Sequence, residues 1–81
     1  MNEELAITAG AVARRARARL GLSQADVAVR VGISPEVYAR LERGRALPSV
    51  VTLRRLCQVL ALDANALLGL PDARGRSEAV R

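Results

Sequence analysis

Regularly spaced residues that end and start helices constrain the fold of this chain more than any other sequence feature. Four glycines follow apolar runs, where a helix commonly ends in a left-handed residue: Gly21, Gly32, Gly44 and Gly69. Four side chains suited to capping a helix precede such runs: Ser23, Ser34, Ser49 and Asp63. Ser23 and Asp26 also have the spacing of a capping box, and Pro35 occupies the first position of a helix.

These helix-starting and helix-ending residues predict five short helices and an all-α fold. We place the helices at about residues 9–20, 24–31, 35–43, 50–61 and 64–68. No run alternates polar and apolar residues, so we expect no sheet. The chain of 81 residues is long enough for one domain and too short for two. We therefore expect one domain at 1–69 and a flexible tail at 70–81, where the helical periodicity is lost.

Composition argues against several classes of function. The chain has one Tyr and no Phe or Trp, so a pocket for a small-molecule substrate would be hard to line. It has no His and one Cys, and we find no paired-carboxylate site, phosphate loop or metal-ligand cluster. We expect no enzyme, no cofactor and no metal. No apolar run approaches the roughly 18 residues of a membrane span, and the acidic N-terminus does not resemble a secretory signal. The expected location is the cytoplasm of a bacterial or phage-type system, at the nucleoid.

The charge balance points to a polyanionic partner. The net charge is +5, and all 13 basic residues are arginine. The planar guanidinium can make two hydrogen bonds at once to a phosphate or a guanine edge. A GC-rich genome would explain the missing lysine, but it would not explain the excess of positive over negative charge.

The segment 24–43 has the features of a helix-turn-helix. Gly32 can adopt the positive φ that the tight turn requires, and Ala28 is small enough for the two helices to touch. The remaining requirement is a set of apolar residues that fix the helix pair on the rest of the domain. Residues of this kind stand at Val27, Val31, Ile33, Tyr38 and Leu41.

The ordered series of these motifs resembles the Cro/Xre family of helix-turn-helix regulators, which have the lambda-repressor-like fold. The matching residues are Gly21-Leu22-Ser23-Gln24, Val27-Ala28, Val31-Gly32-Ile33-Ser34, Leu41-Glu42-Arg43-Gly44, Pro48-Ser49, Leu53, Leu56, Ala61-Leu62 and Leu67-Leu68. They cover roughly residues 10–69. The resemblance implies a compact five-helix domain that binds double-stranded DNA and regulates transcription from an operator, without an enzymatic step.

The resemblance also implies roles for individual residues. The third helix would enter the major groove, and the positions that would face base edges are Ser34, Pro35, Glu36, Val37 and Arg40. The resemblance implies phosphate contacts at Ser23, Gln24, Arg43 and Arg45, and we add Arg14 and Tyr38 as further candidates for phosphate contact. Arg17 and Glu42 match a pair that ties the first helix to the third.

Several residues have a second interpretation. The arginine-rich run at 14–19 is either a phosphate track or a solvated helix face, and we assign Arg15 and Arg19 to the solvated face. Arg54 and Arg55 are assigned to a solvated face as well. Tyr38 is expected in the core with its hydroxyl at the surface, and the alternative places that hydroxyl on a DNA phosphate. The lone cysteine is expected to be a small buried hydrophobe.

Glu36 leaves a second function open. Pro35-Glu36 stands where many family members have Arg, Gln, Ser or Thr, and a carboxylate opposes DNA binding unless it accepts from a cytosine amino group. The alternative function is a protein-binding adapter that keeps the fold without DNA readout.

The last turns carry more leucines than so small a domain needs. They either cap the core or form a two-fold dimer interface, and we expect a homodimer. The proposed interface residues are Leu60, Leu62, Leu67, Leu68 and Leu70. A protein co-regulator is a further partner that the sequence leaves open.

Overall fold

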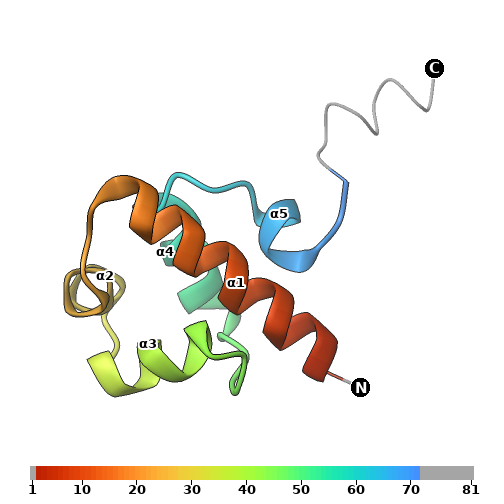
Figure 1. The fold of residues 1–81 in the computed structure, drawn as a ribbon, viewed down its shortest axis with the longest axis horizontal. Helices are drawn as coiled ribbons and strands as arrows, with labels where there is room; N and C mark the ends of the chain where they lie inside the picture. The colour runs from red at the N-terminus through yellow and green to blue at the C-terminus, as the bar shows by residue number, and fades with distance from the viewer. Residues whose placement is uncertain (1, 72–81) are drawn as a thin grey trace.

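The computed structural model describes residues 2–71, which form five helices and no strand. In chain order they are α1 (Glu3–Leu20), α2 (Gln24–Val31), α3 (Pro35–Glu42), α4 (Val50–Val59) and α5 (Ala64–Leu68) (Figure 1). The predicted all-α class is confirmed, and α2 to α5 have the predicted bounds to within two residues. Of the tail predicted at 70–81, residues 72–81 lie outside the described residues.

The start of α1 was predicted wrongly. The helix begins at Glu3, well before residue 9, and Ala6 N donates to Asn2 O at 2.9 Å to close its first turn. Gly10 is a poor helix former and weakens the helical pattern in this stretch. The acidic Glu3 and Glu4 lie in the first turn, where negative charge interacts favourably with the helix dipole.

The capping side chains define the other helix starts. Ser34 Oγ accepts from Val37 N and Ser49 Oγ accepts from Thr52 N, both at 3.1 Å. Asp63 accepts from Asn65 N at 3.0 Å at the start of α5. Each such cap stabilises a helix by about 1 kcal/mol, so the local sequence fixes the residue at which each of these short helices begins.

The core lies where α1 crosses the other helices (Figure 1). α1 contacts α3 and α5, while α2 packs between α3 and α4. Alanines on the buried face of α1 allow close approach, and Tyr38 fills the centre with 0% of its surface exposed. Cys57 is half-buried, which is less than the full burial predicted for it. Burial raises the pKa of its thiol, and the negative charge of Asp63 raises it further.

Gly10 sets the spacing between α1 and the end of α3. A Cβ added there would lie 2.3 Å from Leu41 O and 2.7 Å from Glu42 O. Real Cβ contacts are much longer, so only a glycine fits at this crossing. The position of α3 on the domain therefore depends on one missing side chain in α1.

In residues 2–71, no helix combines the length and the apolar character needed to cross a membrane.

Candidate nucleic-acid interface

α3 buries one face and leaves the other in solvent. Tyr38 and Leu41 point into the core, with 0% and 5% of their surfaces exposed. The five predicted base-facing residues are all exposed, and they lie at the start of α3 and one turn further on: Ser34, Pro35, Glu36, Val37 and Arg40. All five are therefore accessible at the N-terminal half of α3, and we call this set of residues the α3 face.

The beginning of the α3 face is held rigidly. The Ser34 cap bonds Val37 N, and Pro35 restricts the backbone at the first helical position. Glu36 lies in the first turn, where the helix dipole stabilises a carboxylate without any partner. Glu36 and Arg40 are one turn apart, but they form no ion pair in the part of the chain that the structure describes. Arg40 is thus available to a ligand.

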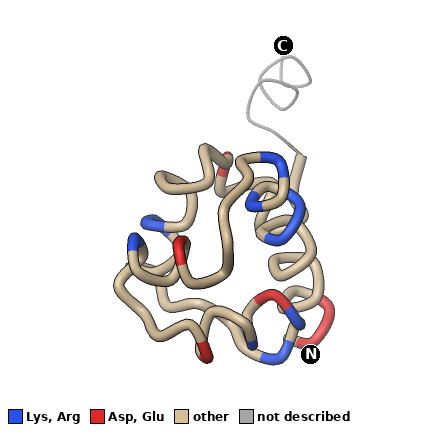
Figure 2. Tube along the Cα trace, turned by 60° about the vertical axis from the view of Figure 1, so that its left-hand side comes forward, with Lys and Arg blue, Asp and Glu red and all other residues tan. Residues whose placement is uncertain are grey.

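Three of the predicted phosphate-contacting arginines lie around the C-terminal end of α3. Arg43 is the C-cap residue, and Arg45 N donates to Arg40 O at 3.0 Å in the loop that follows. Arg14 is one helical turn from Gly10, whose backbone meets this same end of α3. All three side chains are exposed. Figure 2 shows that basic residues occur on several elements.

The start of α2 contains a capping box. Asp26 N donates to Ser23 Oγ at 3.0 Å, and Ser23 N donates to Asp26 Oδ2 at 2.9 Å. The hydrogen bonds from Ser23, backbone first, hold the pKa of Asp26 below its ordinary value. The Ser23 hydroxyl is thus engaged with Asp26, and the Asp26 carboxylate beside it opposes an anion.

Tyr38 was predicted wrongly as a phosphate contact. The side chain is completely buried, and its hydroxyl has no hydrogen-bond partner within the described residues, although it lies beside Glu42 and Arg17. Burial raises the pKa of the phenol above its ordinary value, and the Glu42 carboxylate raises it further. Because no part of Tyr38 reaches the surface, neither a surface hydroxyl nor a contact to DNA is possible.

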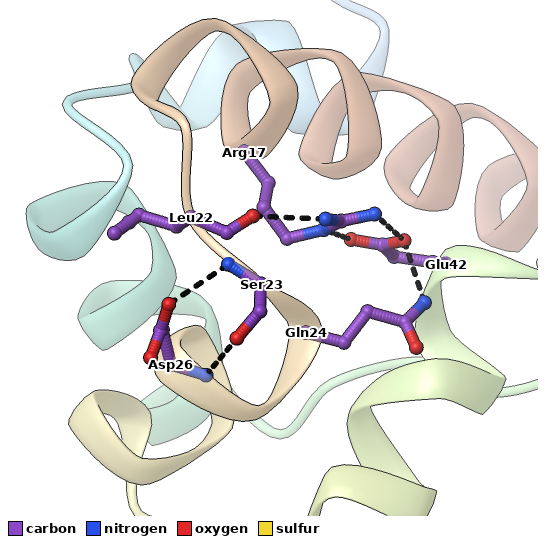
Figure 3. A network of polar contacts seen from close by, with 6 residues as sticks. All are labelled: Arg17, Leu22, Ser23, Gln24, Asp26 and Glu42. Atoms are coloured by element: carbon purple, nitrogen blue, oxygen red, sulfur yellow. Dashed lines mark hydrogen bonds and ion pairs between the residues drawn. The ribbon is translucent and has the colours of Figure 1, made fainter.

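Arg17 and Glu42 form the ion pair that fixes α3 on α1 (Figure 3). Arg17 Nε lies 2.5 Å and Nη2 lies 3.0 Å from the two Glu42 carboxylate oxygens. Arg17 Nη1 donates to Leu22 O, and Gln24 Nε2 donates to Glu42 Oε1, both at 2.9 Å. The network therefore joins α1, the loop after it, α2 and α3 through four side-chain hydrogen bonds.

The pair is buried enough for its charges to matter. The Glu42 side chain is 3% exposed and that of Arg17 is 19% exposed. Burial alone would raise the pKa of Glu42, but the hydrogen bonds from Arg17 and its other neighbours outweigh burial and lower the pKa. The same hydrogen bond raises the pKa of Arg17. Gln24 is half-buried with its amide committed to Glu42, so its backbone N–H is better placed than its side chain to meet a phosphate.

Two of the leucines assigned to a dimer interface belong to the core instead. Leu60 and Leu67 are each 1% exposed, so they have no surface to offer a partner, and this part of the prediction was wrong. With only one aromatic residue in the chain, leucines must supply the bulk of the core. Leu62 is half-buried against that core, while Leu68 and Leu70 are exposed.

Sequence reasoning missed two residues that make close contacts with other helices. Gly10 was not singled out, although a glycine within a helix commonly marks a close contact. Arg55 was assigned to a solvated face, but its Nη1 donates to Val31 O at 3.2 Å, at the last residue of α2. No sequence pattern indicates that second contact, because it joins residues from separate helices.

Comparison with known proteins identifies the family. A family model described as a helix-turn-helix domain matches residues 8–70. The chain belongs to this family. The match covers α2, α3 and the part of α1 from residue 8 onward, and α1 contacts α3.

Relatives and solved structures agree with this assignment. The chain is 43% identical over 49 residues to an uncharacterized HTH-type transcriptional regulator of Sinorhizobium fredii, covering 60% of this chain and 64% of the relative. It is 29% identical over 75 residues to endothelial differentiation-related factor 1 of Rattus norvegicus, covering 91% of this chain and 51% of that protein. The chain thus spans less than two thirds of the length of either relative.

The fold is similar to that of the clp gene regulator ClgR from Corynebacterium glutamicum. The TM-score is 0.74 at 29% sequence identity, over 94% of this chain and 78% of the ClgR chain. The helix arrangement seen here is therefore that of a solved gene regulator.

Proposed function

We propose that this chain is a DNA-binding transcriptional regulator that inserts α3 into the major groove of an operator. The observation that carries the proposal is the α3 face, whose five residues are exposed at the start of a helix that the Arg17–Glu42 pair fixes on α1. A helix in the major groove contacts base edges with the first residues of the helix and one residue a turn later. The family and the printed names of the relatives support the same function.

In this function the residues divide into base-reading and phosphate-binding groups. Arg40 reads a guanine through its two-pronged guanidinium, and Glu36 accepts from the amino group of a neighbouring cytosine. Ser34, Pro35 and Val37 make the remaining contacts, with Val37 able to touch a thymine methyl group. Phosphates are bound by Arg14, Arg43 and Arg45 and by the start of α2 at Ser23 and Gln24.

The regulator acts as a homodimer by occupying its operator, and no chemical step is involved. In such a dimer the two copies of α3 lie about 34 Å apart, one turn of DNA. The exposed Leu68 and Leu70, with the edge of Leu62, supply the apolar surface for the second copy. A protein co-regulator could bind the same exposed end of α5.

A second candidate function is a protein-binding adapter. The observation that favours it is the exposed carboxylate of Glu36 on the α3 face, which repels phosphates. An adapter would keep the helix-turn-helix fold, and its α3 face would contact a protein.

Binding to a random-sequence DNA duplex at several salt concentrations separates the two functions. Each phosphate contacted releases counterions and adds about 0.9 to the slope of log affinity against log salt. The regulator predicts measurable affinity at low salt that falls steeply as salt rises. Affinity that is absent at low salt, or that does not change with salt, would reject DNA binding and favour the adapter.

A further inference from the structure

We propose that Arg55, on α4, is a positioning residue of the DNA-binding surface, because it fixes the turn from which α3 begins. The inference rests on the proposed function. Arg55 is exposed, and it lies outside the α3 face and outside the group of phosphate-binding residues. Its effect on DNA binding is exerted through α2 and the turn.

The contact is made at the C-terminal end of α2. Arg55 Nη1 donates to Val31 O at 3.2 Å, and Val31 is the last residue of that helix. Carbonyl groups in the last turn of a helix lack intrahelical partners and carry the negative end of the helix dipole. A guanidinium placed there forms a charge-assisted hydrogen bond, which is stronger than a neutral one.

The same guanidinium also lies close to Gly32, the residue after Val31. A Cβ added to Gly32 would lie 2.9 Å from Arg55 Nη1, so any side chain at this position would displace the guanidinium. Gly32 also has φ of +86°, which favours glycine. The turn glycine thus has a second role besides its φ angle, because it leaves room for Arg55.

Arg55 connects the turn to the fixed part of the domain. Its neighbour Leu56 is buried in the core, so α4 is anchored to the domain next to Arg55. On the other side the turn is held by backbone bonds, since Gly32 N and Ile33 N both donate to Ala28 O. Ser34, the first residue of the α3 face, follows two residues after the glycine. Releasing Val31 O therefore loosens the end of α3 that would enter the groove.

The test compares Arg55→Gln with Arg54→Gln, a matched control that removes the same charge from the preceding residue of α4. Both variants are titrated with the duplex that the parent selects from a random pool. Arg55→Gln is expected to lose about fivefold in affinity, equivalent to about 1 kcal/mol, with the salt slope unchanged. Arg54→Gln is expected to bind like the parent.

Three results would overturn the inference. Parental affinity for Arg55→Gln would remove the positioning role. A salt slope reduced by about 0.9 would make Arg55 a direct phosphate contact instead. A parent that selects no duplex at all would reject the proposed function, and this inference with it, so the two failures are distinguishable.

A second measurement needs no DNA and applies if Arg55→Gln is poorly folded. Gly21 also has a positive φ, +70°, but nothing lies within 4 Å of an added Cβ there. In the parent, Gly32→Ala is expected to lower the urea midpoint more than Gly21→Ala, because it also displaces Arg55. In an Arg55→Lys background the planar guanidinium is replaced by a smaller ammonium group, which leaves room for a Cβ at Gly32. The two glycine substitutions should then lower the urea midpoint by the same amount. Equal costs in the parent would contradict the contact.

Discussion

Replacing Gly10 by alanine tests how closely α1 and α3 approach each other. In an isolated helix this substitution is stabilising by about 1 kcal/mol, because alanine has the higher helix propensity. In this protein the new Cβ would lie 2.3 Å from Leu41 O and 2.7 Å from Glu42 O. Both obstacles are backbone carbonyl oxygens, so they cannot rotate away as the end of a side chain could.

The clash should outweigh the gain in propensity. Relief requires α1 and α3 to separate by about 1 Å, and overpacking of this kind costs typically 1–3 kcal/mol or more. Because rigid backbone is involved, we take the upper end and subtract the propensity term. The expected net destabilisation is about 2 kcal/mol. For a domain of this size that corresponds to a melting temperature lower by about 8–16 °C.

The assay is urea and thermal unfolding followed by circular dichroism at 222 nm. Ala18→Gly is the matched control, because Ala18 is exposed on the same helix and reports propensity alone. It should be destabilised by about 1 kcal/mol. Gly10→Ala should be destabilised more than Ala18→Gly, even though alanine at position 10 has the higher helix propensity. A Gly10→Ala protein that melts at or above the parent temperature would refute the close approach of the two helices.

The other predictions concern the buried network and the dimer. Arg17→Ala should lower the free energy of unfolding by about 3 kcal/mol, since it leaves the buried Glu42 carboxylate unpaired; a parental melting curve would contradict this. The pKa of Glu42 is lowered in the folded state, so its contribution to stability is present above its ordinary pKa of 4.5 and is lost as pH falls through the folded value. Glu42→Gln should flatten that acid dependence in unfolding curves. Tyr38→Phe should keep or raise stability, because it removes a buried hydroxyl that has no partner in the described chain; a loss would reveal a hydrogen bond. Sedimentation should find a dimer that Leu68→Asp weakens together with operator binding, and a parent that is monomeric at micromolar concentration would exclude the dimer.

Much of the fold follows from local sequence signals. Ser34 and Pro35 predict the start of α3, and Gly32 predicts the end of α2, because each forms its contacts within a few residues. The start of α1 was missed because its N-terminal half is stabilised by tertiary packing across Gly10, and local propensity underestimates such a segment. Tertiary contacts of this kind leave a weak trace in a single sequence.

The candidate site was predictable in its outline and less so in its details. The residues of the α3 face follow from the family resemblance, and the Ser34 cap marks where they begin. The exclusion of Tyr38 does not, because a tyrosine suits both a core and a surface position. The number of leucines near the C-terminal end likewise does not show which of them are buried. In the structure Leu60 and Leu67 lie in the core, whereas Leu68 is exposed. The role of Arg55 depends on how α4 is placed against α2, which only the three-dimensional structure reveals.

Selection of bound sites from a random DNA pool, run in parallel with the parent and with Arg40→Ala, tests most directly whether α3 reads DNA. The parent should enrich a defined site. Arg40→Ala should bind that site at least about tenfold more weakly and lose preference at one G·C pair, as expected when a bidentate contact to guanine is removed. Arg45→Ala, the control for a phosphate contact, should weaken specific and random DNA about equally. If Arg40→Ala selects the same site with the same affinity as the parent, α3 does not read DNA in the way proposed.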